Sequence, residues 1–231
     1  SLKEHQVRKL WQEAQDIFEY LLIIGYCVWG LRTGELAKVR VSQFVFDPDD
    51  PRIEFVEENS RKNGIGSVTL LFGLPVLALR LDRLNQKEEW SGYLFLGDTG
   101  DGHLHPATLR RRFKKLCESA NITVEGETPT PKDARSYYYN ILAKAETSLL
   151  KGVAEFAPEQ GSKDPETIVE RYLDEETRRH FRRVFFRQHQ RNVLPDDAYN
   201  GPSDVGPYPT GRDEYCTSGN SGQNTDSEED D

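Results

Sequence analysis

Arginine and lysine side chains occur at positions where they could hold an anion. Arg32 follows an apolar run and stands between Gly30 and Gly34, which leave room for a turn. Lys132 and Arg135 lie three apart in the first turns of an expected helix, so their side chains share one face. Cations near a helix N-terminus oppose the helix dipole, which is unfavourable unless an anion binds there. The pattern indicates a phosphate-like ligand, although Arg32 alone is also compatible with a solvated turn residue.

Lys62 and Tyr172 are further basic and nucleophilic candidates. Lys62 directly precedes Asn63-Gly64, a pair typical of a two-residue β-hairpin turn, and Arg61 is the alternative if the register shifts by one. Tyr172 belongs to an expected helix that follows a loop rich in Gly, Ser, Lys and Asp. Taken singly, a hairpin lysine is compatible with a surface residue and a helical tyrosine with a core residue, so the order of all candidates matters more.

That order resembles the catalytic domain of the tyrosine recombinases, the phage-integrase family. The stretches of this sequence that carry the resemblance are, in order, "GLRTGEL", a hairpin lysine, "TPKDARSYYYN" and "QGSKDPETIVERYL". The resemblance covers about residues 1–185, and the basic C-terminal helix with "NVLPDDA" is similar to archaeal, especially haloarchaeal, members. It implies an α+β fold, mainly α-helical, with a small antiparallel β-sheet.

The resemblance also implies a role for each candidate. Arg32 and Arg135 would grip the scissile DNA phosphate, because a guanidinium meets two phosphate oxygens at once and keeps its proton. Tyr172 would attack the phosphate and form a 3′-phosphotyrosyl bond, while Lys62 would act as general acid toward the leaving 5′-oxygen. The alternative nucleophiles are Tyr137, Tyr138 and Tyr139. Lys132, three residues before Arg135, would also be an active-site residue and could donate a hydrogen bond to the phosphate. No metal or nucleotide cofactor would be needed, since the covalent link conserves the ester energy.

The sequence departs from the family at two positions. In "TPKDARSYYYN", Lys132 replaces the histidine that the family usually has three residues before its second arginine. In "QGSKDPETIVERYL", Ser162 and Lys163 follow Gly161, where the family usually has Gly-His. Ser162 or Lys163 could serve as a further phosphate ligand, or that ligand could be lost. Glu35 is expected either to orient Arg32 or its neighbours, or to be an ordinary acid early in a helix.

These departures leave three functions open. The first is a site-specific recombinase or integrase, and the second is strand cleavage and rejoining like that of a type IB topoisomerase. The third is a DNA-binding relative that has lost catalysis.

Double-stranded DNA is the expected partner. A helix opened by Pro106 and a late helix at 176–191 are both dense in basic residues, which suits phosphate contacts but also a solvated charged face. The resemblance further implies self-association, as a tetramer on DNA, through the C-terminal helix. The DNA-binding candidates of the first helix are Arg110, Arg111, Arg112, Lys114 and Lys115.

The charge of the chain is concentrated at one end. The net charge of −9 comes from residues 195–231, which hold ten acidic residues and one arginine, whereas residues 1–194 are neutral. We therefore expect a catalytic domain at 1–194 and an acidic, disordered tail at 195–231. The three cysteines are far apart and odd in number, which favours free thiols in a reducing compartment. The expected location is the cytoplasm, on the nucleoid.

The candidates require a mostly helical frame. Helices are predicted over 2–14 with Ser1 as cap, 15–28, 34–40, 74–85, 106–120, 131–145, 148–156, 166–173 and 176–191. Strands are predicted over 52–57 and 66–72, joined as a hairpin, with a further short strand at 93–96. The segment 15–28 is apolar nearly all round and should be buried.

Overall fold

The computed structural model describes residues 1–47, 51–55, 66–69, 74–86, 92–97, 102–156 and 164–193. Helices predominate, and the described strands form one small antiparallel sheet, which confirms the predicted fold class. Among the described helices, none combines the length and the apolar character that a bilayer crossing requires. The predicted hairpin tip and the acidic tail lie outside the described residues.

The first helix, α1 (Glu4–Glu13), packs an apolar stripe into the core. It begins at Glu4 because the side chain of Gln6 accepts the backbone N–H of Lys3 at 2.8 Å, which makes Lys3 the cap. The prediction that Ser1 caps this helix is therefore wrong. Ser1 Oγ instead accepts a hydrogen bond from Asn140 Nδ2 at 3.1 Å.

A long apolar segment leads directly to Arg32. α2 (Ile17–Ile23) starts where the Asp16 carboxylate accepts the N–H of Glu19 at 2.8 Å, and it continues into a π-helical segment, η1 (Ile24–Val28). Every residue of η1 is buried, which confirms the predicted buried helix. Short π-helical segments are rare, and those that do occur are often found at functional sites.

Three strands follow in the order β1 (Phe44–Val45), β2 (Arg52–Phe55) and β3 (Gly66–Thr69), each antiparallel to the next. β2 and β3 confirm the two predicted strands. Their register sets Ile53 opposite Val68, and both are buried, so the sheet turns an apolar face to the core.

Short elements connect the apolar segment to the sheet. α3 (Thr33–Ala37) is followed by a 3₁₀ turn, η2 (Val41–Gln43). The stretch 93–96 forms isolated bridges, one of them between Arg40 and Tyr93, rather than the predicted strand. Its backbone hydrogen bonds go to two different short segments, around 39–41 and 102–104, and neither is long enough for a ladder.

Two more helices cover the body, and a third leaves it. α4 (Leu74–Asn85) and α5 (Pro106–Ser119) lie where the sequence predicts them. α6 (Pro131–Phe156) is one helix of 26 residues, where the sequence predicted two. The buried residues Ala145 and Leu149 continue one face across the expected break, so packing carries the helix through it.

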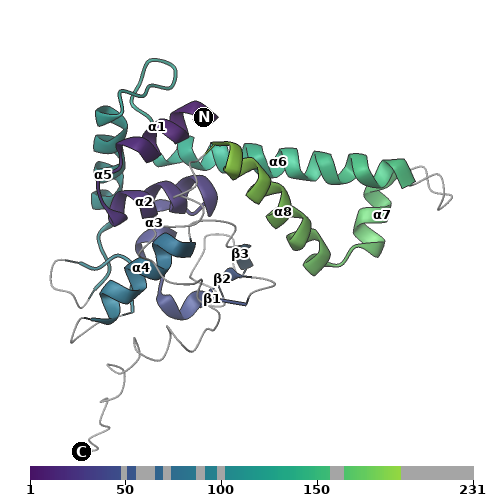
Figure 1. Cartoon of the computed structure of the whole chain (residues 1–231), viewed down its shortest axis with the longest axis horizontal. Coiled ribbons are helices and arrows are strands. Elements are labelled where there is room, and N and C mark those ends of the chain that lie inside the picture. Colours follow the sequence, from purple (N-terminus) through teal and green to yellow (C-terminus); the bar gives the residue numbers. More distant parts are fainter. Residues whose placement is uncertain are drawn as a thin grey trace, which may run out of the picture.

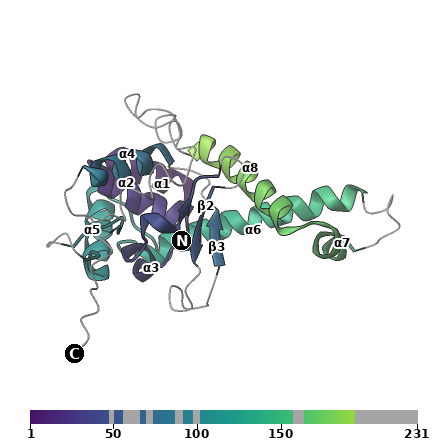
Figure 2. The same ribbon diagram turned by 90° about the horizontal axis from the view of Figure 1, so that it is seen from below.

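An arm of three helices projects from the body. α6 runs outward, α7 (Pro165–Tyr172) lies at its far end, and α8 (Glu175–Val193) runs back toward the body (Figures 1 and 2). At the helical rise per residue, α6 is about 39 Å long. Both views place α7 away from α3, the helix that begins next to Arg32.

The described cysteines are free thiols within the core, as predicted. Cys27 and Cys117 are both buried. Burial raises the pKa of Cys117 to about 12 and raises that of Cys27 as well, so both remain protonated and serve as apolar packing groups. Cys216 lies outside the described residues.

Candidate active site

Arg32 is held at the start of α3 by the carboxylate of Glu35. The backbone N–H of Arg32 donates to Glu35 Oε2 at 2.7 Å, and its guanidinium donates from Nη1 to Oε1 at 3.0 Å. The Glu35 side chain is 5% exposed and that of Arg32 is 36% exposed, so a buried carboxylate supports a guanidinium that reaches solvent. This geometry fits the orienting role expected for Glu35 better than that of an ordinary helix acid.

A buried tyrosine supports the same turn. Tyr26 Oη donates a hydrogen bond to Thr33 Oγ1, the first residue of α3, at 3.3 Å. Burial raises the pKa of Tyr26 to about 12, so the hydroxyl keeps its proton and remains a donor. The apolar segment before Arg32 is thus tied to the helix after it.

Arg135 reaches the turn that carries Arg32. Its Nε donates to the backbone carbonyl of Gly30 at 2.9 Å, across 105 positions of the sequence. Lys132 is exposed one turn earlier on α6. The structure therefore ties the second predicted arginine to the backbone two residues before the first, with Lys132 nearby on the same helix.

Gly30 is required for this contact, but Gly34 is not. Gly30 has φ of +62°, and a Cβ placed on it would lie 2.2 Å from Cδ1 of Tyr138. Gly34 lies inside α3, and a Cβ there would meet nothing within 4 Å. The expectation that both glycines shape the turn is therefore correct only for Gly30.

Tyr139, expected from the sequence only as an alternative nucleophile, contacts Arg135 in a way that the sequence did not predict. Tyr139 Oη accepts a hydrogen bond from Nη2 of Arg135 at 3.2 Å, and the guanidinium lies 5.4 Å from the centre of its ring. The spacing of four on one helix is the signal that could have indicated this pair.

The other predicted catalytic residues are described only in part. Tyr172 is the last residue of α7, on the arm. Lys62, with its alternative Arg61, and the pair Ser162 and Lys163 lie outside the described residues, so their roles stay predictions.

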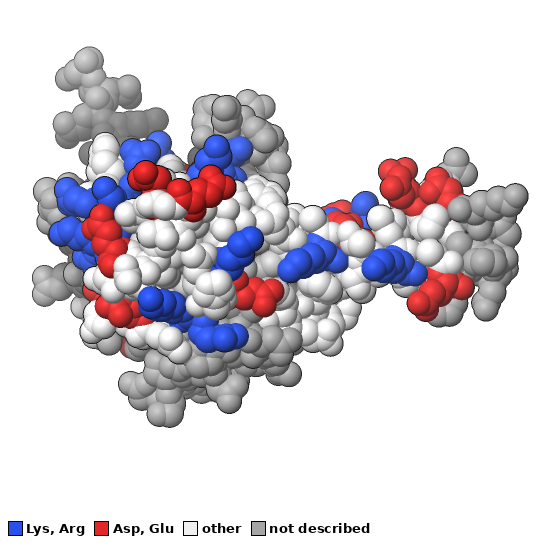
Figure 3. Space-filling view, turned by 90° about the horizontal axis from the view of Figure 1, so that it is seen from above, with Lys and Arg blue, Asp and Glu red and all other residues white. Residues whose placement is uncertain are grey.

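The basic residues of α5 divide into two groups. Arg110, Arg111, Lys114 and Lys115 are exposed. Arg112 is bound to α2 and its cap, because its Nη2 donates to the Asp16 carboxylate at 2.9 Å and its guanidinium lies 4.5 Å from the ring centre of an α2 phenylalanine. Figure 3 shows basic side chains interspersed with acidic ones over the face it displays, and continuing onto the arm.

Arginines of α8 make contacts within the arm. Arg182 Nε donates to Glu146 of α6 at 2.6 Å, and Arg178 lies 3.5 Å from a glutamate in the first turn of its own helix. Arg183 is buried. The Arg182 contact joins α8 to α6, and the Arg178 contact lies within α8. The ion pairs of Arg178 and Arg182 and the burial of Arg183 favour packing over DNA contact for these three arginines.

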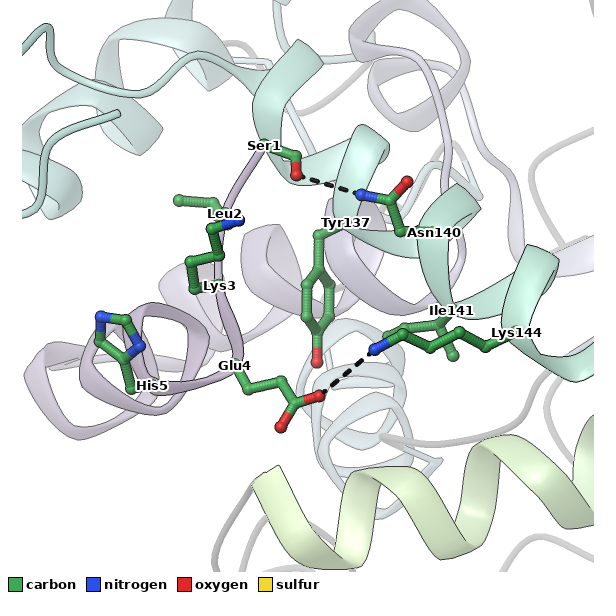
Figure 4. A pocket seen from close by; sticks show the side chains of 9 residues that line it. All are labelled: Ser1, Leu2, Lys3, Glu4, His5, Tyr137, Asn140, Ile141 and Lys144. Atoms are coloured by element: carbon green, nitrogen blue, oxygen red, sulfur yellow. Dashed lines mark hydrogen bonds and ion pairs between the residues drawn. The ribbon is translucent and has the colours of Figure 1, made fainter. Parts of the chain in front are cut away.

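A pocket of about 550 Å³ lies on the α1 side of α6, and it contains none of the predicted catalytic residues. Figure 4 shows Glu4 pointing toward Lys144, 3.8 Å away. His189 of α8 lies 3.7 Å from the same carboxylate and 3.2 Å from Tyr137 Oη. Burial lowers the pKa of His189 and raises that of Tyr137, so we interpret the His189 contact as one of a neutral imidazole. The described residues include no group of three potential metal ligands.

Comparison with known proteins supports the fold. No model of a known protein family matches the sequence, and no match is found among curated proteins. Among solved structures, the chain is similar to the crystal structure of XerA recombinase, with a TM-score of 0.52 and 16% sequence identity. The likeness covers 82% of this chain and 63% of that one, so the chain spans less than two thirds of its structural neighbour. The described architecture is thus that of a recombinase fold.

Proposed function

We propose that this chain is the catalytic domain of a tyrosine-type, site-specific DNA recombinase. The observation that carries the proposal is the hydrogen bond from Arg135 to the carbonyl of Gly30, which ties a second guanidinium to the turn of Arg32. Two fixed guanidinium groups suit a phosphate that gains charge in its transition state. The likeness to XerA recombinase supports the same assignment at the level of the fold.

The proposed reaction is a transesterification at one DNA phosphate. Arg32 and Arg135 bind its non-bridging oxygens, and Lys132 adds a third cation. The Tyr172 hydroxyl gives its proton to water, and its oxygen attacks phosphorus while the bond to the 5′-oxygen breaks. Lys62 gives that oxygen a proton, which yields a 5′-hydroxyl and a 3′-phosphotyrosyl bond. The reverse attack by a 5′-hydroxyl rejoins a strand.

The proposal extends to the domains and partners. Residues 1–194 form the catalytic domain, residues 195–231 form an acidic tail, and duplex DNA is the substrate. Exposed Arg110, Arg111, Lys114 and Lys115 of α5 contact phosphates outside the cleaved one. The C-terminal helix mediates self-association on DNA.

A covalent-adduct assay tests the proposal. The substrate is a pool of nicked duplexes with a randomised core, so that cleavage near the nick releases a short fragment and traps the protein on DNA. We expect an adduct that is recovered under denaturing conditions and lost in Tyr172→Phe. Arg32→Ala and Arg135→Ala should lower its rate of formation roughly 100-fold or more, because each removes a transition-state ligand.

Tyr93→Phe is the matched control. It removes a tyrosine hydroxyl that accepts from Arg40, which is not a predicted catalytic residue, at 2.8 Å, and it should leave adduct formation unchanged. Relaxation of a supercoiled plasmid of arbitrary sequence would favour the topoisomerase alternative. Retained DNA binding with no adduct from any member of the pool would contradict catalysis and favour a binding relative.

A further inference from the structure

Arg135 and three neighbouring residues, Gly30, Tyr138 and Tyr139, form a closed ring of contacts. Gly30 packs against the ring of Tyr138, so closely that a Cβ would collide with it. Tyr138 meets Tyr139 edge to face, with ring centres 5.2 Å apart. Tyr139 accepts from Arg135, and Arg135 donates back to the carbonyl of Gly30. Each member is therefore positioned by two neighbours in the set.

Some hydrogen-bond donors of Arg135 and Tyr139 bind within the protein, and others remain available to a ligand. Arg135 uses Nε for Gly30 and a hydrogen of Nη2 for Tyr139, which leaves Nη1 for a phosphate oxygen. Since Tyr139 Oη accepts the hydrogen bond from Arg135, its own O–H remains available as a donor. The cation beside it withdraws electron density from the oxygen and makes that O–H a stronger donor.

The exposure of Tyr139 is not explained by packing. The residue is 45% exposed, and Val184, at 41%, is another large apolar residue with comparable exposure. The Arg40–Tyr93 pair gives a useful comparison, because there both residues are half-buried and the tyrosine also takes part in a backbone bridge. Tyr139 instead lies at the surface beside the proposed phosphate site.

We propose that Tyr139 is a further phosphate-binding residue of this site, donating its hydroxyl proton to a non-bridging oxygen of the phosphate held by Arg32 and Arg135. The inference rests on the proposed function and adds a ligand to it. The stretch Gly161–Lys163 lacks the histidine that the family usually has there. Tyr139, on α6, would supply a neutral hydrogen-bond donor in its place. Tyr172 remains the nucleophile.

Tyr139→Phe tests this role, because it keeps the ring and its contacts with Tyr138 and removes only the hydroxyl. With a substrate selected from the nicked pool, we expect adduct formation at saturating protein to slow roughly 10- to 100-fold, the effect of losing a hydrogen bond to a charged group. The affinity for uncleaved duplex should change less than threefold or so, since many other phosphates contribute. Tyr93→Phe should show neither effect.

A chemically altered substrate separates phosphate binding from a structural role. In a methylphosphonate substrate, one non-bridging oxygen of the scissile phosphate is replaced by a methyl group. For the stereoisomer that lacks the oxygen bound by Tyr139, the wild type and Tyr139→Phe should react at equal rates. A slowing that persists equally with both stereoisomers would overturn the proposal in favour of a structural role.

The remaining outcomes also decide. Wild-type rates in Tyr139→Phe, with Arg135→Ala inactive, would overturn the role of Tyr139 and leave the proposed function intact. Absence of any adduct in the wild type would instead contradict the proposed function itself. Loss of the adduct in Tyr139→Phe combined with its survival in Tyr172→Phe would identify Tyr139 as the nucleophile and overturn its role as a ligand.

Discussion

Glu35 fixes both the backbone and the side chain of Arg32. One carboxylate oxygen accepts the N–H of Arg32 and the other accepts from its guanidinium. A single buried side chain therefore sets where α3 begins and where the guanidinium points. Such preorganisation matters because an arginine with many rotamers would otherwise lose conformational entropy each time it bound a phosphate.

Glu35→Gln should separate these two contributions. Glutamine can still accept the backbone N–H of Arg32, but it carries no charge for the guanidinium. We expect adduct formation to slow roughly tenfold or more and the free energy of unfolding to fall by about 1–3 kcal/mol, as for other lost charged hydrogen bonds. Both are measurable on the same preparation, by adduct kinetics and by denaturant unfolding.

Glu54→Gln provides the control for this prediction. It removes a carboxylate whose ion-pair partner is Arg52, 2.7 Å away within β2, rather than Arg32. If Glu54→Gln slows adduct formation as much as Glu35→Gln does, the orienting role of Glu35 is contradicted.

Residue types and spacing predicted Arg32 and Arg135, but not the bond that connects them. That bond runs from Arg135 to a backbone carbonyl 105 positions away, and no local pattern contains it. Glu35 could be proposed because it lies three positions after Arg32 in an expected first turn. Tyr139 was not distinguished from Tyr137 and Tyr138, because consecutive residues of a helix face different directions and the sequence does not show which one faces Arg135.

At the scale of elements, the junction of η1 and α3 depends on the left-handed backbone of Gly30. A side chain there would cost about 1–2 kcal/mol in backbone energy alone. It would also displace Tyr138, whose ring fills the space of the missing Cβ. The buried apolar segment before it makes the junction rigid.

Gly30→Ala is therefore expected to lower the free energy of unfolding by more than about 2 kcal/mol and to slow adduct formation. Gly34→Ala should be neutral or stabilising by up to about 1 kcal/mol, because the position is helical and open. Denaturant unfolding of the two variants makes the comparison. Equal destabilisation by both would contradict the account of this turn.

The end of α8 docks on the body through a histidine whose pKa is lowered by burial. Tyr137, Glu4 and Lys144 surround His189, and Glu4 partly offsets the effect. Because the pKa of His189 is lower in the native state, the unfolded chain binds more protons than the native chain at any pH between the native and the ordinary pKa. The stability contributed by His189 is thus fully present above about pH 6.5 and is lost as the pH falls below it.

His189→Gln should flatten this part of the pH dependence. Glutamine can also form a hydrogen bond with Tyr137, as donor or acceptor, but does not titrate. We expect the difference in stability between pH 7.5 and 5.5, measured by denaturant unfolding, to be smaller in the variant than in the wild type. A wild type whose stability rises as the pH falls through this window, while the variant's does not, would contradict the sign.

The sequence predicted most elements of the body and, in the arm, predicted α7 and α8 but divided α6 in two. Amphipathic periodicity and the Pro at its start located α5, and alternating residues located β2 and β3. The polar stretch Glu146–Ser148 suggested a break in α6, but tertiary contacts with α7 and α8 keep it helical. Helix propensity alone is a weak guide where packing decides.

At the scale of the whole molecule, the arm separates the two halves of the proposed chemistry. The arginine pair lies where the start of α6 meets the turn between η1 and α3 in the body, whereas α7, which ends at Tyr172, lies on the arm (Figure 1). This arrangement favours delivery of Tyr172 to the arginine pair of a second copy. It agrees with the proposed self-association through the C-terminal helix.

A mixture of Arg135→Ala and Tyr172→Phe proteins should then form adduct, although each is inactive alone. Only the Arg135→Ala chain should carry the DNA, which a size difference between the two proteins reveals on a denaturing gel. If both variants bind DNA and the mixture stays inactive, Tyr172 acts within its own chain.

The central claim is that Tyr172 becomes covalently joined to DNA, and mass spectrometry of the trapped adduct tests it most directly. Digestion with trypsin should give a peptide from Tyr172 to Arg178, because cleavage follows Arg171 and Arg178. After nuclease trimming, we predict that the tyrosine of this peptide carries a nucleotide joined through its 3′-phosphate. The same modification on the peptide that contains Tyr137, Tyr138 and Tyr139, with the Tyr172 peptide unmodified, would contradict the account.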